Sequence, residues 1–595
     1  MCIRDRLYCA YRISQKHPDW KIAIFERLNR TGGRLDSDLI QLTKDGKIPK
    51  KGTKNVYTIK EEQGGMRFNK GMEELMALIE HLDLCEETVP FPMSSDVDGE
   101  NTNRYLFRGR EFTVAEAQAS NQKIWSELYD LERAEIGLSP DELIENAFNR
   151  ILQENDYPIG EVHDPDSWTD IRENCQWNGK NLNEWHIWSL LSDMGYSEEC
   201  IRMMADTTGF PDTFKAFTNA GCAFQALADF PKDPEFYTFK EGFSTLPKKV
   251  LEKMGDNVKI YLSTNLNTIH DREGKFKLCL SEAEEGHNAT PFDKKMTPVF
   301  ANKLILATAT KGIQDLFYKS PALFRPKEVE SKEAQKLWEK LNEVEGAELM
   351  KVNLYFRESW WLNSMTNRPP VQFGPNFTTL PINAIYPFYA LESIEFGDKK
   401  ACKGPSQTTD AAPHFKDGAL GNPAALTLYC DYNKTPFWEG LQNIGPMFDS
   451  ELQRHFNKQN PQKLYPASQV LVDELMKQLA ILFGATNLPK PILSTYRAWN
   501  GKDDYEYAFY QWKLNAVDSE TRQYLSKPYD NKDLYFCNES ISDMQAWVNG
   551  SLRSANMALA HFDIQPMKKA TGLLKSRSVP STVAKRRHKF GGIWG

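Results

Sequence analysis

Apolar residues near the start of the chain follow first a helical and then a strand-like pattern. Residues 7–17 repeat their apolar positions about once per helical turn, which predicts a helix. Residues 22–25 form a short continuous apolar run, which is typical of a strand buried on both faces of a parallel sheet. A second helical pattern follows at 72–83. This order of elements predicts an α/β fold built on a parallel sheet.

The same alternation returns in two later parts of the chain. Residues 242–270 indicate a glycine turn, a helix and a strand, and residues 303–310 indicate another buried strand. Near the end, residues 534–562 indicate a strand, a turn and a long helix. We therefore predict one discontinuous dinucleotide-binding domain. Its predicted segments are 7–83, 238–320 and 490–565.

Two further domains are predicted between these segments. Residues 105–237 are mostly helical in pattern, with their most amphipathic stretch at 183–197. Residues 84–104 and 321–489 are predicted to form a substrate-binding domain with a mixed sheet. The basic residues 566–595 are predicted to be a disordered tail. Strands of these regions are predicted within 105–113, 347–361, 383–392 and 424–432.

Composition excludes several classes of protein. The chain has 595 residues, 41% of them hydrophobic, and a net charge of −8, which disfavours nonspecific nucleic-acid binding. It has no apolar run as long as the roughly 18 residues that a membrane span needs. The ten cysteines lack metal-ligand spacing, so we expect buried free thiols and no metal site. Localisation stays open between the cytoplasm and export.

Candidate cofactor ligands follow the first predicted strand. Glu26 ends the apolar run, and a carboxylate at that position can accept both hydroxyls of an adenosine ribose. Gly32 and Gly33 allow the backbone to approach a ligand closely. Arg34 adds a fork-shaped cation that suits a pyrophosphate.

Residues 21–37, KIAIFERLNRTGGRLDS, resemble the FAD-binding segment of the flavin amine oxidases, and EEQGGMRF (61–68) resembles the branch that oxidises amino acids. The resemblance implies FAD as the cofactor. It also implies a Rossmann-like FAD-binding domain of the glutathione-reductase or amine-oxidase type, a mixed-sheet substrate domain and a helical insertion. Further cofactor contacts are implied for Arg27, Gly64, Gly65, Met66, Arg67 and, through its strand backbone at the adenine, Leu266.

The segment 534–555 resembles the closing signature of the same family. Glu539 matches the glutamate that lies along the ribityl and phosphate part of FAD. Asn538 replaces a glycine, and asparagine tolerates a left-handed backbone better than most residues. Trp547 resembles the tryptophan wall of the substrate pocket. Ala546, which also replaces a glycine, would accept a hydrogen bond from the substrate amine through its carbonyl and contribute to the flavin site.

Arg67 resembles the arginine that binds the substrate carboxylate through two parallel hydrogen bonds. The alternatives are a surface arginine or an ion-pair partner of Glu61 or Glu62. Tyr386 resembles the tyrosine whose hydroxyl also reaches the carboxylate. Tyr389 is the competing candidate, and core packing is the alternative role of either ring.

Lys351 resembles the lysine that holds a water beside flavin N5, and the alternative is an exposed lysine at a strand end. The aromatic segment 503–515 alternates with period two and resembles a pocket segment that is glycine-rich in bacterial amine oxidases. This chain lacks those glycines. Trp512 is the candidate pocket residue there, with core packing as the alternative.

The first six residues, MCIRDR, depart from the family pattern. A Gly-x-Gly-x-x-Gly loop that follows a buried strand is expected immediately before residue 7, and residues 1–6 contain no glycine. We interpret residues 1–6 as a non-native leader on a shortened reading frame. The alternative is a divergent start that binds no dinucleotide.

The resemblance implies oxidation of an L-amino acid by O2 to a 2-oxo acid, ammonium and hydrogen peroxide, with FAD as the electron carrier. Three alternatives stay open. They are an amino-acid 2-monooxygenase that forms an amide, an amine or polyamine oxidase, and a non-catalytic flavin-fold protein. The substrate side chain and the oligomeric state, with a homodimer among the alternatives, are not determined by the sequence.

Overall fold

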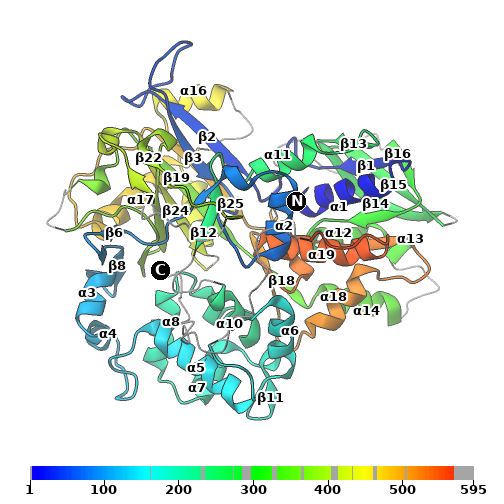
Figure 1. Cartoon of the computed structure of the whole chain (residues 1–595), viewed down its shortest axis with the longest axis horizontal. Helices are drawn as coiled ribbons and strands as arrows, with labels where there is room; N and C mark the ends of the chain where they lie inside the picture. Colours follow the sequence, from blue (N-terminus) through cyan, green and yellow to red (C-terminus); the bar gives the residue numbers. More distant parts are fainter. Residues whose placement is uncertain are drawn as a thin grey trace.

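The computed structural model arranges the chain in three packed regions, which Figure 1 shows at the right, the upper left and the bottom. It describes residues 3–160, 163–229, 235–272, 274–283, 297–324, 332–363, 368–403, 413–431, 433–459, 466–502 and 506–568. The region at the right contains the predicted dinucleotide-binding elements. The region at the upper left is built on a large sheet, and the region at the bottom is helical.

Two separate pairs of parallel strands form the dinucleotide-type sheet. β1 (Ile22–Phe25) pairs with β13 (Val258–Tyr261). β17 (Leu304–Leu306) pairs with β27 (Leu534–Phe536). The strands predicted in these parts of the chain are confirmed, and the mixed α/β fold class is confirmed with them.

A cavity of about 850 Å³ lies between β1 and β17. No described strand fills it. In the doubly wound strand order 3-2-1-4-5, this position belongs to the strand that leads into the first helix. That helix, α1 (Ile3–Lys16), begins earlier than predicted, so residues 3–6 form its first turn. The guanidinium of Arg6 joins the ends of β1 and β17, because it donates to the carbonyls of Phe25 and Ala307.

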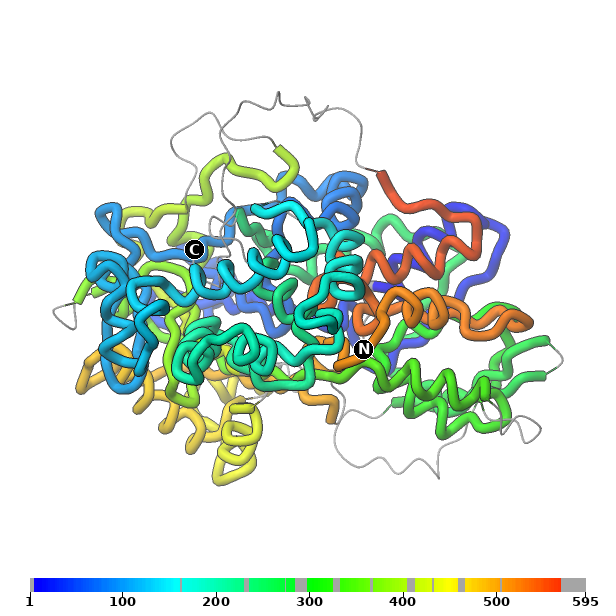
Figure 2. The backbone as a smooth tube through the Cα atoms, turned by 90° about the horizontal axis from the view of Figure 1, so that it is seen from below, coloured from blue at the N-terminus to red at the C-terminus, as the bar shows by residue number. Residues whose placement is uncertain are grey.

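Helices from the two ends of the chain pack side by side. α1 lies against α19 (Val548–Ala560), and Figure 2 shows the blue and red tubes in contact. The Tyr8 hydroxyl donates to the Asn556 side-chain carbonyl at 3.0 Å. Apolar residues of both helices belong to one core, which also includes α2 (Glu73–His81). The predicted FAD-binding segments are therefore held together by their first and last helices.

The chain between β13 and β17 forms an antiparallel sheet. Its strands are β14 (Thr264–Arg272), β15 (Lys275–Glu282) and β16 (Thr297–Ala301). The single strand predicted at 259–270 is therefore two strands, β13 and β14. The backbone turns between them at Ser263, whose φ is +47°.

The upper left region is built on a seven-stranded sheet in the order β25-β19-β24-β21-β20-β8-β9. The hairpin of β8 and β9 and the strand β25 pair with this sheet, so the region extends across the boundaries predicted at 105 and 490. The strands are β25 (Leu493–Trp499), β19 (Leu349–Phe356), β24 (Ala424–Asp431), β21 (Ala384–Tyr389), β20 (Asn376–Thr378), β8 (Arg104–Phe107) and β9 (Arg110–Thr113).

The helical region spans residues 114–229. The amphipathic stretch 183–197 is not one helix, because a 3-10 turn precedes α7 and Gly195, with φ +91°, follows it. The helices are α3 (Val114–Ala119), α4 (Lys123–Leu128), α5 (Pro140–Glu154), α6 (Pro165–Asn174), α7 (Ile187–Asp193), α8 (Glu198–Thr207), α9 (Asp212–Lys215) and α10 (Ala220–Ala228).

Short strands and surface helices complete the described chain. None of its described helices combines the length and apolarity needed to cross a membrane. The strands include β2 (Ser37–Leu42), β3 (Tyr57–Glu62), β4 (Phe68–Asn69), β5 (Thr88–Pro90), β12 (Phe236–Phe239), β18 (Val344–Ala347) and β26 (Phe509–Trp512). The helices include α11 (Thr245–Glu252), α12 (Thr310–Lys319), α13 (Pro321–Phe324), α14 (Lys332–Leu341), α15 (Thr435–Gln442), α16 (Glu451–Gln459), α17 (Gln469–Leu482) and α18 (Asp518–Ser526).

Two of the cysteines form a disulfide, Cys85–Cys402. The prediction of free thiols is wrong for this pair, because the 317 residues between them leave no local spacing signal. The bond joins the chain after α2 to the segment that follows β22 (Ile394–Glu395). The other described cysteines are free thiols. Cys2 and most of the predicted basic tail lie outside the described residues.

Candidate active site

A cavity of about 200 Å³ lies where the three regions meet. The structure brings many of the predicted site residues to its wall, from segments far apart in the sequence. Those residues are Arg34, Gly64, Gly65, Met66, Arg67, Lys351, Trp512, Ala546 and Trp547. Arg27 and Leu266 instead line the larger cavity beside β1. The remaining predicted residues, which are Glu26, Gly32, Gly33, Tyr386, Asn538 and Glu539, lie outside both linings.

Arg67 lies at the cavity wall among aromatic rings. Its side chain is only 6% exposed, which excludes the surface-arginine alternative. The guanidinium carbon lies 5.4 Å from the ring centre of Phe236 and 5.6 Å from that of Phe91. Nη1 donates to the Tyr386 hydroxyl at 3.4 Å. A guanidinium at a cavity wall can form two parallel hydrogen bonds to a carboxylate, so this position suits an anionic part of a ligand.

Of the two candidate tyrosines, Tyr386 is the one that contacts Arg67. Residues three apart on β21 point to opposite faces of the sheet. The Tyr389 hydroxyl accepts from Trp361 Nε1 at 2.8 Å and donates to the Gln372 carbonyl at 2.6 Å, on the other face. Strand geometry therefore separates two tyrosines that the sequence alone left equivalent.

Lys351 lies inside β19, where its ammonium group reaches the cavity. The side chain is buried, so the exposed strand-end alternative is wrong. Nζ donates to the Glu62 carbonyl at 3.0 Å and to the Gly64 carbonyl at 2.6 Å. Burial lowers the pKa of Lys351 to about 8, although the carboxylates of Glu62 and Glu61 partly offset that effect. A lysine with this pKa can exchange a proton near neutral pH.

Gly64 is required by a close approach of two chain segments. A Cβ atom added at this position would lie 2.0 Å from the Arg34 carbonyl oxygen. Gly65 N donates to the same carbonyl at 3.0 Å. The Gly64-Gly65 pair therefore fixes the backbone between Lys351 and Arg67, and a larger residue at 64 would push these segments apart.

Ala546 adopts a left-handed conformation with φ +70°. The family has glycine at this position, and glycine would adopt this conformation more easily than alanine does. Its N–H donates to Glu539 Oε1 at 2.6 Å, which helps to hold the turn. Trp512 lines the cavity nearby, and its indole N–H donates to the Ser542 carbonyl at 3.0 Å.

Arg34 and Glu539, which come from opposite ends of the sequence and were both predicted near the phosphates of the cofactor, form a buried ion pair with each other. Arg34 Nη2 lies 2.7 Å from Glu539 Oε2, and Arg34 Nη1 donates to the Ala508 carbonyl at 2.7 Å. The pair joins the first and last predicted cofactor segments at the cavity wall.

Asp229 is a cavity residue that sequence analysis missed. It caps the C-terminal end of α10 and accepts a hydrogen bond from Trp547 Nε1 at 2.7 Å. Burial raises its pKa to about 7, against opposing effects of the Trp547 hydrogen bond and the Arg172 charge. An acid is unfavourable at the negative end of a helix dipole, and that is the one signal in the sequence that could have marked this position.

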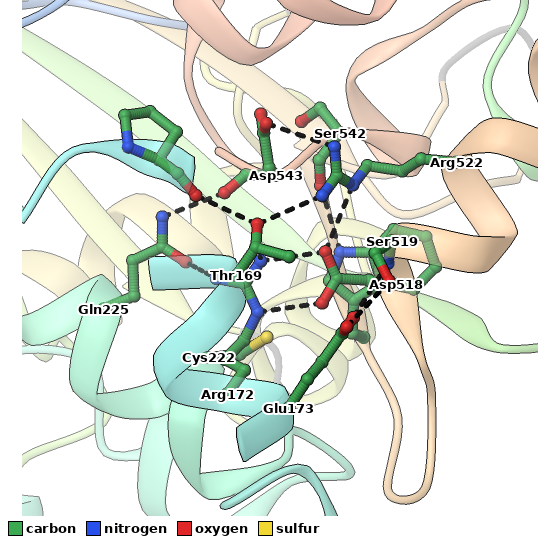
Figure 3. Close-up of polar contacts among 12 residues, drawn as sticks. Thr169, Arg172, Glu173, Cys222, Gln225, Asp518, Ser519, Arg522, Ser542 and Asp543 are labelled. Carbon is green, nitrogen blue, oxygen red and sulfur yellow. Dashed lines mark hydrogen bonds and ion pairs between the residues drawn. The ribbon is translucent and has the colours of Figure 1, made fainter. Parts of the chain in front are cut away.

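A buried polar network fixes α10 behind the cavity (Figure 3). Arg172 pairs with Asp518 through Nη2 and Oδ2 at 2.8 Å, and it also donates to the Gln225 side chain. Gln225 Nε2 donates to the Asp543 carbonyl at 2.9 Å. The network therefore ties helices α6 and α10 to the segment that carries Ala546 and Trp547.

Glu26 is buried at the end of β1, as its predicted role requires. Its Oε1 accepts from Leu28 N at 2.8 Å, and its Oε2 lies 3.4 Å from Arg6 Nη1. Asn538 corrects an expectation, because its φ of −171° is extended and not left-handed. An asparagine side chain therefore replaces glycine here without a conformational cost.

The residues between the two cavities fit FAD. Gly32 and Gly33 have φ values of +105° and +58°, which gives a turn that exposes backbone groups. Arg34 follows this turn, and Glu539 balances its charge. Asn538 Nδ2 is buried without a hydrogen-bond partner among the described residues, so a ligand oxygen could satisfy it. This donor set matches an anionic, hydroxyl-rich cofactor whose ring end would meet Lys351.

A model of the flavin containing amine oxidoreductases matches residues 7–395. A search of curated proteins found no match. Among solved structures, a putrescine oxidase redesigned in its cofactor binding is 13% identical with a TM-score of 0.56, covering 94% of this chain and 96% of that one. A protein from Exiguobacterium sp. 255-15, provisionally named a protoporphyrinogen oxidase, is 12% identical with a TM-score of 0.51 over the same shares.

The two structural likenesses lie at identities that support the fold alone. The family match covers more than half of the chain. The cofactor is FAD, as in the rest of the family. The chain belongs to the family of flavin containing amine oxidoreductases.

Proposed function

We propose that this protein oxidises an L-amino acid to a 2-oxo acid. The observation that carries the proposal is the buried guanidinium of Arg67 at the wall of the cavity that Lys351 and Trp547 also line. A plain amine offers such a cation no anionic partner. An α-carboxylate does, through two parallel hydrogen bonds that orient the α-carbon.

The residues of the cavity, together with Tyr386 beside Arg67, have distinct proposed tasks. Arg67 and the Tyr386 hydroxyl would bind the carboxylate, and the Ala546 carbonyl would accept from the substrate amine. Trp547 would form one wall. Lys351, with a pKa near 8, would hold a water and exchange protons with it. Bound FAD supplies the two-electron oxidation of the Cα–H bond and passes the electrons to O2.

The overall reaction balances with water as the second co-substrate. Amino acid, O2 and water give 2-oxo acid, ammonium and hydrogen peroxide. The Cα–N bond of the imino acid is broken by water after oxidation. We further propose that the predicted FAD-binding, substrate-binding and helical domains divide these tasks. The predicted homodimer is a separate proposal, and light scattering of the purified protein tests it.

The experiment is a panel of L-amino acids and amines with parallel detection of peroxide, 2-oxo acid and amide. Peroxide with 2-oxo acid from L-amino acids is expected. An amide with carbon dioxide would indicate the 2-monooxygenase alternative. Turnover of amines without turnover of amino acids would indicate an amine or polyamine oxidase. FAD-loaded protein with no turnover of any substrate would favour a non-catalytic protein.

A further inference from the structure

The cavity contains a carboxyl group that has no task in the proposed oxidation of an amino acid. Two carboxylates line it, Asp229 and Asp543. Asp543 pairs with Arg553 at 2.7 Å and with Arg522 at 3.2 Å, so its charge is balanced within the protein. Asp229 has no ion pair within 4.0 Å among the described residues, and its side chain accepts a hydrogen bond from the neutral Trp547 indole.

Two aromatic rings connect Arg67 to Asp229 through successive contacts. The Arg67 guanidinium lies 5.4 Å from the Phe236 ring centre. The Phe236 ring is stacked with that of Trp547 at a centroid separation of 6.3 Å and an angle of 11°. The other edge of Trp547 donates to Asp229. A cation and an acid that both line the cavity are therefore connected through two rings.

Two sets of contacts fix the position of Asp229, one at its side chain and one at the helix that ends at this residue. The Trp547 N–H orients one carboxylate oxygen. The helix that ends at Asp229 is held by the network in Figure 3, in which Gln225 donates to the Asp543 carbonyl and Arg172 pairs with Asp518. A carboxyl group held in this way in a mostly apolar cavity favours a ligand with a cationic group, because such a ligand pairs with the ionised carboxylate.

We propose that Asp229 binds a cationic group at the far end of the substrate side chain. This inference rests on the proposed function and specifies its substrate class: L-amino acids whose side chain ends in an ammonium or guanidinium group. Arg67 binds the α-carboxylate at one end, and Asp229 binds the distal cation at the other. The raised pKa of Asp229 agrees with this role, because a bound cation would favour the ionised carboxylate.

The test compares L-lysine with L-norleucine, which lacks the ammonium group. The variants are Asp229→Asn and the control Asp193→Asn. Asp193 also accepts from an indole N–H, that of Trp177 at 2.8 Å, but lies outside the cavity lining. Wild type is expected to favour L-lysine. Asp229→Asn is expected to lower kcat/KM for L-lysine by about 30-fold or more and to change that for L-norleucine by less than about 3-fold.

Reduction of bound FAD by L-lysine without oxygen, followed by absorbance in the flavin band, gives a second readout, in which Asp229→Asn should raise the apparent Kd for L-lysine by a similar factor. Equal use of L-lysine and L-norleucine by the wild type, or an equal loss for both in Asp229→Asn, would overturn the proposal. Asp193→Asn should change neither substrate.

Failure of the proposed function is distinguishable from failure of this inference. If no L-amino acid gives a 2-oxo acid, the carboxylate role of Arg67 fails. Titration with cadaverine and 1-aminopentane then tests Asp229 alone. Tighter binding of cadaverine that is lost in Asp229→Asn supports the distal-cation site, and equal binding of the two amines rejects it.

Discussion

The Arg34 guanidinium and the Glu539 carboxylate lie 2.7 Å apart although their residues are 505 positions apart in the sequence. Both side chains are almost fully buried. Glu539 also accepts from the Ala546 N–H, so this single pair connects the first cofactor segment to the turn that lines the cavity.

Breaking this pair should destabilise the fold. Arg34→Leu leaves the Glu539 charge buried without its partner, and we expect a loss of about 3–5 kcal/mol in the free energy of unfolding. Arg34→Leu combined with Glu539→Leu should recover part of that loss, because no charge then stays buried. Chemical denaturation of the four proteins measures the effect. Additive losses in the double variant would show that the two charges do not interact.

Arg67→Leu tests the carboxylate site. Removing a bidentate, charge-assisted partner should reduce kcat/KM for an L-amino acid by roughly 2–4 kcal/mol in free energy, with FAD content retained. The control is Arg108→Leu, which also removes an arginine over an aromatic ring, that of Tyr129 at 4.0 Å. Unchanged kinetics in Arg67→Leu would exclude the carboxylate role.

Ala546→Gly tests the backbone strain at the cavity. Since φ at this residue is +70°, glycine should relieve it and raise the free energy of unfolding by about 1 kcal/mol. The matched change Ala555→Gly, in the interior of α19, should lower it instead by about 1 kcal/mol. Thermal unfolding of both variants shows whether each change raises or lowers the stability of the fold. If Ala546→Gly destabilises the protein, the packing of the alanine methyl group contributes more stability than the backbone strain removes.

The raised pKa of Asp229 makes stability depend on pH. The folded protein binds this proton up to about pH 7, whereas the unfolded chain releases it near 3.8. Its contribution to stability therefore falls as pH rises through this interval. The groups that act on it are the Trp547 indole and the Arg172 charge. The melting temperature of Asp229→Asn minus that of wild type should increase from pH 5 to pH 8. A constant difference would show that Asp229 ionises normally.

Glu26→Ala tests the adenosine site. Loss of the carboxylate should lower FAD occupancy and thermal stability together, because a bound cofactor stabilises the fold by mass action. Arg6→Ala separates the two effects, since it removes the cation 3.4 Å from Glu26 and keeps the carboxylate. Absorbance in the flavin band, taken with melting curves, measures both. Full occupancy in Glu26→Ala would place the ribose elsewhere.

Several site residues could be predicted because their signals are local. The apolar run 22–25 predicted β1, and Glu26 was predicted at the end of this strand because it is the acid that follows the run. Gly64 and Gly65 preceded Arg67 in a short motif, and all three line the cavity. Patterns of this kind depend on residues within one or two turns of each other, and the sequence contains them directly.

Other features required contacts between distant segments. The Cys85–Cys402 disulfide joins residues 317 positions apart, and no spacing marks it. The choice of Tyr386 over Tyr389 depended on which face of β21 meets Arg67. The left-handed backbone expected at Asn538 occurs instead at Ala546, because the turn lies further along the chain.

The sequence by itself determined the α/β class and several of the residues that line the cavity, because apolar periodicity and short glycine motifs are encoded locally. Only the tertiary structure decided that Arg34 pairs with Glu539 and that Asp229 meets Trp547. The first contact arises when the segment after β1 packs against the closing segment, and the second when the end of α10 packs against that same segment. Their burial, charge and pKa values are properties of that packing, and no single stretch of sequence specifies them.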